Sequence, residues 1–224
     1  SFVALQTHVV PLIGVAVYSV ASIAGQTAMS LIVDRIGFTG GGKKLISKRR
    51  MASAIITVIA VLISVWDRLS VATFSVLAVA LATLAGVMVG VQRALNGQIN
   101  EHSNQSFATS LLNFINGTAA LFILFIALHF IKGDKFAPLP SGPWWIYLGG
   151  TIGVIYIAFS ATIVQHLGVL TFTLFSVGGT LFGSLLIDVI SPSKGTHVTW
   201  YLVIGILLTY SGVIAGGQSR LFKR

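Results

Sequence analysis

Amide side chains occur inside apolar stretches of this sequence, where they are costly. Asn113 and Asn116 lie three residues apart within the apolar run 106–130, so a helix would place both on one face. They would lie roughly 10 and 15 Å along such a helix. Because an unpaired amide in hydrocarbon costs about 4–8 kcal/mol, we expect both to face protein or a water-filled cavity. Two roles stay open: hydrogen bonds that pack helices together, or the lining of a substrate cavity.

A second set of amides follows the apolar run 70–91. Gln92, Asn96 and Asn100 recur every four residues, which places them on one stripe of a helix, and Arg93 flanks that stripe. The stripe is expected where the helix leaves the membrane, so solvated residues at a helix end explain Arg93 and Asn100 equally well. Gln92 and Asn96 are nearer the apolar run, and we expect them to face the interior.

Two further side chains join this set. Gln26 lies inside the first long apolar run, where a hydrogen bond to a neighbouring backbone is an equally good explanation. Trp145 follows Pro143 beside Trp144, an arrangement typical of a membrane interface, although it could also line an entrance. The candidate substrate-binding residues are therefore Gln26, Gln92, Asn96, Asn113, Asn116 and Trp145.

The sequence offers no residues for catalysis or metal binding. The chain has no cysteine, and its histidines lack a second ligand at metal-binding spacing. The acids lie at or beyond the ends of the apolar runs, so none is placed to relay protons at mid-membrane. We therefore expect no enzyme activity, no cofactor and no metal. These acids are Asp34, Asp67, Glu101, Asp134 and Asp188.

The composition places these residues in a bilayer. The chain is 55% hydrophobic and 8% charged, with a mean hydropathy of +0.92, so polar side chains cannot cover its surface. The runs are continuously apolar, which predicts an all-α polytopic membrane bundle. Glycine pairs at four-residue spacing, Gly86/Gly90, Gly149/Gly153, Gly179/Gly183 and Gly212/Gly216, predict close helix packing. The predicted spans are 11–33, 51–65, 70–91, 106–130, 144–164, 167–187 and 200–217.

One sequence motif occurs twice, 154 positions apart. The segments Gly14–Ile36 and Gly168–Ile190 match at Gly25/Gly179 and Asp34/Asp188, among other positions. The second copy lies five spans after the first, an odd number, so the copies should cross the bilayer in opposite directions. We therefore predict two inverted five-helix repeats, a pattern typical of transporters.

The repeat also predicts how the chain is divided. Residues 1–69 form the C-terminal part of the first repeat, a partial span and two helices, and residues 70–224 form the second repeat. Ser1 aligns with Ile155, midway along a helix of the second repeat, so we expect the first repeat to be incomplete at its N-terminus and the structure to begin within a span.

The net charge of +9 has a pattern that membrane topology explains. If residues 34–50 are cytoplasmic, 10 basic residues lie inside and 4 outside, as the positive-inside rule requires. The C-terminus is then cytoplasmic as well. Gly37–Lys44 matches part of a phosphate-binding loop, but it follows an apolar helix and has Lys in place of Ser or Thr, so we interpret it as a flexible basic hairpin. Nucleic-acid binding is not expected.

Several of these residues together resemble the YdcZ family of the drug/metabolite transporter superfamily. The segments Gln92–Asn96, Phe114-x-x-Gly117, Pro143–Trp145, Gly149-Gly150-x-x-Gly153 and Gly179–Asp188 look like one complete five-helix unit, and Gly25, Gln26, Ser30, Asp34 and Gly37 look like the end of a preceding unit. The resemblance implies a bacterial inner-membrane exporter with ten helices in two inverted repeats. Thr180 departs from the pattern, which has Gln after Gly.

We therefore expect a secondary transporter that exports small metabolites or drugs by alternating access. Its expected partners are a small-molecule substrate and the lipid bilayer, and a homodimer is left open. The alternative is a non-transporting membrane scaffold or assembly protein in which the amides serve only helix packing.

The predicted topology can be tested with an impermeant maleimide, because the chain has no cysteine. Single cysteines at Thr39 and Ser193 should react from opposite sides of the membrane in intact cells. Labelling of both from the same side would contradict the inverted repeat.

Overall fold

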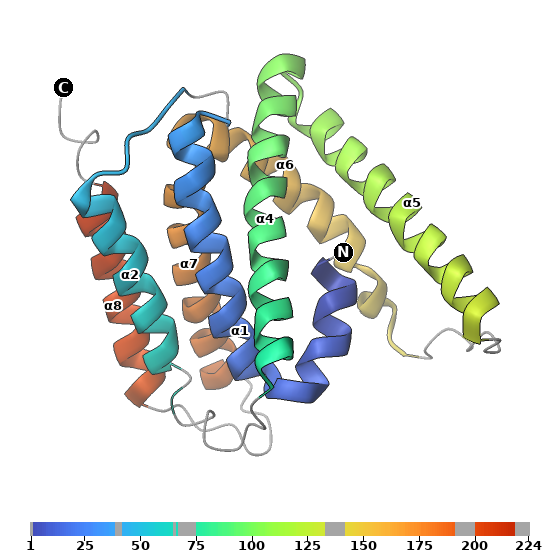
Figure 1. The fold of residues 1–224 in the computed structure, drawn as a ribbon, viewed down its shortest axis with the longest axis horizontal. Helices are drawn as coiled ribbons and strands as arrows, with labels where there is room; N and C mark the ends of the chain where they lie inside the picture. The colour runs from blue at the N-terminus through green and yellow to red at the C-terminus, as the bar shows by residue number, and fades with distance from the viewer. Residues whose placement is uncertain are drawn as a thin grey trace.

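All regular structure that the computed structural model describes is helical. The described residues are 2–38, 42–64, 66, 75–132, 142–190 and 200–217. They form α1 (Phe2–Ile36), α2 (Lys48–Ser64), α4 (Val76–Ser103), α5 (Ser106–Lys132), the 3₁₀ turn η1 (Trp144–Tyr147), α6 (Gly149–Leu167), α7 (Val169–Ile190) and α8 (Trp200–Gly217) (Figure 1). The all-α prediction is confirmed. Ser1, Thr39, Ser70 and Ser193 lie outside the described residues.

Some of the helices have the length and composition of membrane spans. Among the described residues, three helical segments are long and apolar enough to cross a bilayer: Val76–Ser103, Ser106–Ile131 and Gly149–Leu167. Shorter apolar segments occur at Val169–Gly183 and Trp200–Gly212. Large hydrophobic side chains are exposed along α5, as expected for a helix that faces lipid or other apolar helices.

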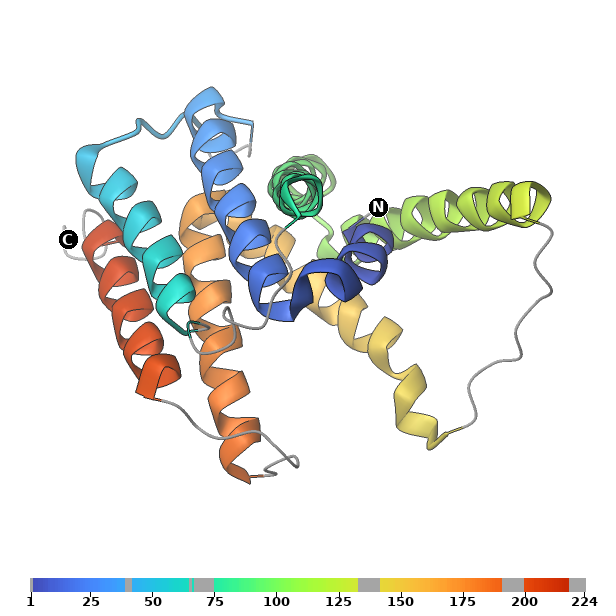
Figure 2. The ribbon, with the colours of Figure 1, turned by 60° about the horizontal axis from the view of Figure 1, so that its bottom comes forward.

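The bundle is arranged around α4 and α7. α1 packs along α4, α2 packs along α8, and α7 contacts both α1 and α8 (Figure 1). α6 contacts α4, α5 and α7, whereas α5 slants away from the rest of the bundle in both views (Figures 1 and 2). α1 ends where α7 begins, so the two helices that carry the repeated motif run in opposite directions.

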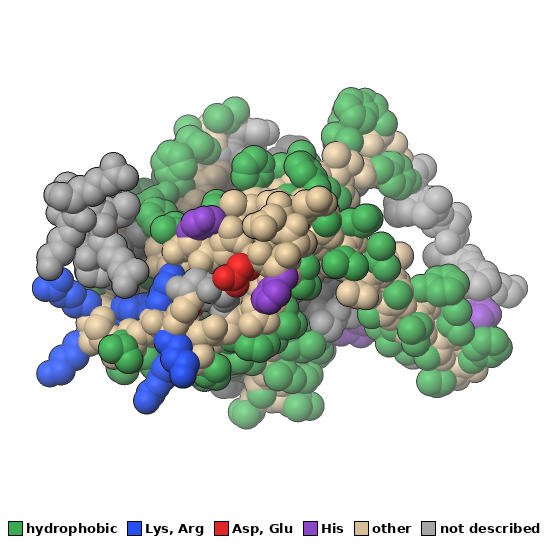
Figure 3. Space-filling view, turned by 90° about the horizontal axis from the view of Figure 1, so that it is seen from above, with side chains coloured by type: hydrophobic (Ala, Val, Ile, Leu, Met, Phe, Trp, Pro, Cys, Tyr) green, Lys and Arg blue, Asp and Glu red, His purple; other side chains and the backbone are tan. Residues whose placement is uncertain are grey.

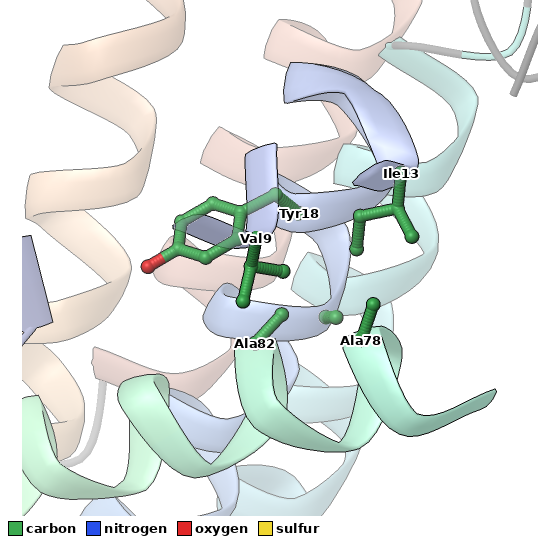
Figure 4. Close-up of a cluster of buried hydrophobic side chains, with 6 residues drawn as sticks. Val9, Ile13, Tyr18, Ala78 and Ala82 are labelled. Atoms are coloured by element: carbon green, nitrogen blue, oxygen red, sulfur yellow. The ribbon is translucent and has the colours of Figure 1, made fainter. Parts of the chain in front are cut away.

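Helix α1 is longer than the predicted span 11–33 and is bent. It begins at Phe2, and the ribbon turns sharply in its N-terminal third (Figures 1 and 2). Pro11 lies in this part, and proline bends a helix because it lacks an N–H and its ring clashes with the preceding turn. The bend brings the first turns of α1 against the start of α4. The buried cluster there contains Val9, Ile13, Tyr18, Ala21, Ala78 and Ala82 (Figure 4).

Glycine allows α1 and α4 to approach closely. A Cβ at Gly86 would overlap the carbonyl oxygen of Ser22, and a Cβ at Gly25 would overlap that of Thr83. Gly90 also faces α1, and a Cβ added there would lie 2.9 Å from the Met29 side chain. The close packing predicted for the pair Gly86 and Gly90 is therefore confirmed.

Other predictions about the helices need correction. A Cβ added at Gly179 or Gly183 would have nothing within 4 Å, so these glycines do not make the close contact predicted for them among the described residues.

The predicted span 144–164 is a 3₁₀ turn followed by α6. The predicted span 70–91 is part of α4, which begins after Ser75 and continues to Ser103. Apolar composition marks only the part of this helix that suits lipid, and the helix contains no proline before its C-cap at Asn104.

The repeat-related glycines offer a matched test of packing. Gly25→Ala forces a methyl group against the Thr83 backbone and should destabilise the protein by about 1–3 kcal/mol. Gly179→Ala adds the same group to open space and should leave stability unchanged or slightly raised, because alanine favours helix. Thermal unfolding of both variants of the intact protein in detergent measures the difference. Equal melting temperatures would contradict the close α1–α4 contact.

Candidate functional site

Three of the predicted site residues form an amide cluster between α4 and α5. Gln92 donates through Nε2 to Asn113 Oδ1 at 2.8 Å, and Asn96 donates through Nδ2 to the same oxygen at 3.4 Å. Asn96 is buried, whereas Gln92 and Asn113 are half-buried. We call Gln92, Asn96 and Asn113 the amide cluster. One acceptor on α5 thus receives donors from two successive turns of α4.

Arg93, which follows Gln92 on α4, points into the bundle toward α6 and α7. Its Nη1 donates to Thr173 Oγ1 at 2.9 Å, and its Nη2 donates to the Tyr156 hydroxyl at 3.4 Å. The guanidinium carbon lies 5.2 Å from the centre of the Phe172 ring, within range for a cation–π contact. Of the two explanations left open for Arg93, a position at the helix end is wrong, because α4 continues for ten residues beyond it.

The hydrogen bonds around Arg93 extend to α1 and have a defined direction. Ser30 donates to the backbone oxygen of Gln26 at 2.6 Å, so its single proton is used there. Thr173, 3.0 Å from Ser30, must then donate to it while accepting from Arg93. Tyr156 accepts from Arg93 and lies 3.2 Å from the Ser176 hydroxyl. We call Ser30, Arg93, Tyr156, Thr173 and Ser176 the arginine network.

The arginine network lies between the two ends of the helix bundle. Thr173 is four residues from the start of α7, and Tyr156 is eleven residues before the end of α6. At about 1.5 Å per residue, these positions are roughly 6 and 16 Å from the end of the bundle where α1 meets α7. Thr173 is fully buried, whereas Tyr156 is 45% exposed. The Arg93 guanidinium therefore contacts a fully buried hydroxyl on α7 and a partly exposed hydroxyl on α6.

Asp34 fixes the start of α7, which carries Thr173. The carboxylate is fully buried at the end of α1, accepting from the Val169 N–H at 2.8 Å and the Leu170 N–H at 3.2 Å. A carboxylate is favourable at a helix N-terminus, where the N–H groups lack helical partners. Arg50 of α2 also donates to this carboxylate and forms an ion pair with it. One side chain thus joins α1, α2 and α7.

A single glycine makes this junction possible. Gly168 is the only residue between α6 and α7, and its φ of +88° is one that residues with side chains rarely adopt. A Cβ added at this position would lie 2.6 Å from Lys44 Nζ and 2.9 Å from Asp34 Oδ2. The side chain of Lys44 also donates to the His166 backbone oxygen at 3.4 Å. This part of the loop 34–50, predicted to be a flexible hairpin, is thus tied to the ends of α1 and α6.

The remaining predicted site residues lie apart from the amide cluster. Gln26 is buried on α1 and donates to Ser22 Oγ at 3.2 Å. Its backbone oxygen accepts the hydrogen bond from Ser30, a member of the arginine network. Asn116 is exposed on α5, because this helix slants away from the bundle. Trp145 is 60% exposed in η1, where its ring meets that of Trp144 edge to face. The structure brings together the residues of α4 and α5 and leaves Asn116 and Trp145 outside.

A further polar contact involves Gln165, a residue that the sequence did not single out. Asn100 donates to Gln165 of α6 at 2.8 Å, and the Asn100 side-chain oxygen is buried without a hydrogen-bond partner. The four-residue spacing of the amides on α4 indicated Asn100, but nothing in the sequence identifies its partner 65 residues away. Arg93 was likewise noted only as a flanking residue, although its charge within a span is a signal of function.

Comparison with known proteins identifies the family. A family model described as "Putative inner membrane exporter, YdcZ" matches residues 1–63 and 77–215, which is most of the chain. The chain belongs to the YdcZ family. A search of curated proteins finds no match. The family resemblance predicted from the amides and glycines is therefore confirmed.

This YdcZ-family chain has a strongly charged end. Viewed from the end where α1 meets α7, lysine and arginine side chains gather at one side, next to hydrophobic flanks (Figure 3). The loop between α1 and α2 and the first turn of α2 supply most of them. They are Lys43, Lys44, Lys48, Arg49 and Arg50.

Removing the Asp34 charge tests the junction of three helices. Asp34→Asn keeps the shape of the side chain but leaves Arg50 without its ionic partner, which should destabilise the protein by about 3–5 kcal/mol. Arg49→Gln, which removes an exposed charge one residue from Arg50, is the matched control and should change little. Thermal unfolding of the intact protein measures both. If Asp34→Asn unfolds at the temperature of the native protein, the ion pair does not hold the junction.

Proposed function

We propose that this chain is part of a secondary transporter that exports small polar molecules across the bacterial inner membrane by alternating access. The binding site would lie where α4 faces α1, α5, α6 and α7. The observation that carries this proposal is the pairing of the amide cluster with the arginine network through consecutive residues of α4, Gln92 and Arg93, within an apolar bundle.

Stability alone is a weak reason for these groups. Hydrogen bonds between membrane helices contribute on average about 0.6 kcal/mol, whereas a charged residue at the centre of a membrane helix costs at least about 2.5–3.5 kcal/mol. A cation–π contact returns roughly 0.5–2 kcal/mol of that cost. The contacts of Arg93 with Phe172, Thr173 and Tyr156 therefore only partly offset the cost of a half-buried charge in this bundle, which supports a role in binding.

The helix directions support the inverted-repeat arrangement that we propose. α1 and α7 carry the two copies of the motif and run in opposite directions. The alignment pairs Gly14, which lies within α1, with Gly168, which separates α6 from α7. Inverted repeats with binding sites at their interface are typical of secondary transporters. The concentration of basic residues in the loop 34–50 supports a cytoplasmic position for it.

One observation favours the alternative of a membrane scaffold. The three amides of the amide cluster hydrogen-bond to one another, as they would if their purpose were to join α4 to α5. Loss of Asn113 distinguishes the two functions, because a scaffold would lose folded protein while a transporter would lose activity.

We expect Asn113→Ala in the intact protein to lower transport about tenfold or more, corresponding to roughly 1.4 kcal/mol of lost binding, with little change in expression or melting temperature. The Asn113→Ala/Asn116→Ala double variant should behave similarly. Transport is measured as uptake of radiolabelled metabolites into inverted membrane vesicles, with vesicles lacking the protein as the baseline.

Thr118→Ala, an exposed position on the same helix, is the matched control and should transport normally. Loss of folded protein in the Asn113 variants, together with no uptake above baseline by the native protein, would contradict the transport proposal and support the scaffold.

A further inference from the structure

The arginine network supplies a positive charge that no carboxylate among the described side chains neutralises. We propose that Arg93 binds the carboxylate or phosphate group of a small organic anion, and that such anions are the substrate class of this transporter. This inference rests on the proposed function and goes beyond it by assigning the charge of the substrate and the residue that selects it.

No described carboxylate pairs with Arg93. Among the described residues, Asp34 forms its ion pair with Arg50. The Asp34 carboxylate also accepts hydrogen bonds from two N–H groups of α7. Glu101 is exposed two turns further along α4. The groups that contact Arg93 are a hydroxyl of Thr173, a hydroxyl of Tyr156 and the ring of Phe172, all of them neutral.

The guanidinium of Arg93 retains donors for a ligand. Arginine has five N–H donors in a planar fork, and two hydrogen bonds from Arg93 are formed within the arginine network. The fork matches the paired oxygens of a carboxylate or phosphate, which makes this recognition specific as well as strong. Thr173 and Phe172 of α7 contact the guanidinium, and Tyr156 of α6, which also contacts it, is partly exposed and so gives a ligand a direction of approach.

The neighbouring groups suit the rest of such a ligand. The amide cluster begins at Gln92, the residue before Arg93, and its amides can both donate and accept hydrogen bonds. The hydroxyl of Ser176 lies beside Tyr156 on the same side of the bundle. A small anion with additional polar groups would therefore find a cation and neutral donors and acceptors within one region.

The charge of the surrounding protein favours anions over cations. The chain carries a net charge of +9, and its basic residues gather at the end of the bundle nearest the start of α7 (Figure 3). A concentration of one sign of charge raises the local concentration of ligands of the opposite sign. A cationic substrate would meet both this potential and Arg93, so cations are disfavoured.

The test pairs carboxylates with neutral amides of nearly the same shape, and adds phosphate and a cation for comparison. The intact protein, reconstituted in proteoliposomes on a solid-supported membrane, is exposed in turn to acetate, succinate and inorganic phosphate, to the neutral acetamide and succinamide, and to tetraethylammonium. Charge movement and tracer uptake are recorded, and thermal stabilisation by each compound is measured in detergent. Separate responses to the carboxylates and to phosphate identify which oxyanion binds.

Three variants assign the response to Arg93. Arg93→Gln removes the charge and keeps a donor for Thr173, so it should abolish the response to anions without lowering the melting temperature of the empty protein. Arg93→Lys keeps the charge without the fork and should retain a weakened response. Arg49→Gln removes an exposed charge at the charged end and should respond as the native protein does.

The outcomes separate this inference from the proposed function. Transport of tetraethylammonium or the amides in preference to anions, or an anion response that survives Arg93→Gln, would overturn the anion inference and leave the transport proposal standing. No movement and no stabilisation by any compound, with Arg93→Gln unfolding at a much lower temperature, would overturn both and assign Arg93 to packing.

Discussion

The structure depends on one buried carboxylate, that of Asp34. It accepts two N–H groups at the start of α7 and the guanidinium of Arg50, so it holds the ends of α1, α2 and α7 together. A buried charge is tolerated only when it is paired and fully hydrogen-bonded, and Asp34 meets both conditions. The position of α7 follows from this junction, and α7 in turn presents Thr173 to Arg93 and to Ser30 of α1. The geometry of the candidate site is therefore set by a contact outside it.

Arg50 and Arg93 differ in the way that separates structure from function. Arg50 has a carboxylate partner, Asp34, so its charge is neutralised within the chain. Arg93 has hydroxyl groups and an aromatic ring instead, which orient the guanidinium but leave its charge uncompensated. A charge that the protein positions without neutralising is most simply explained by a ligand that neutralises it. The amide cluster begins at the adjacent residue, Gln92, which contacts α5, whereas Arg93 contacts α6 and α7.

The sequence predicted those features that a single helix determines. Bilayer thickness sets the length of the apolar runs, so the helices of the bundle were predictable. The burial of Asn96 was predictable from its position close to the apolar run 70–91. Features that depend on contact with a second helix could not be predicted from the sequence. Periodicity gives the face on which a residue lies but not the partner of that face, so the contact of Asp34 with Val169, 135 residues away, could not be derived. Arg93 was expected at a helix end because composition changes there, yet the helix continues to Ser103. Asn116 shares a face with Asn113, but the slant of α5 leaves it exposed.

The central claim is that Arg93 faces a water-accessible binding site within the bundle. Ser176→Cys introduces the only thiol of the chain beside Tyr156, where it can be modified by methanethiosulfonate reagents of either charge. If the claim is correct, the anionic sulfonatoethyl reagent reacts faster than the cationic trimethylammonium reagent relative to their rates with a free thiol, and Arg93→Gln removes this preference. A thiol that neither reagent reaches, or a charge preference that is unchanged by Arg93→Gln, would contradict it.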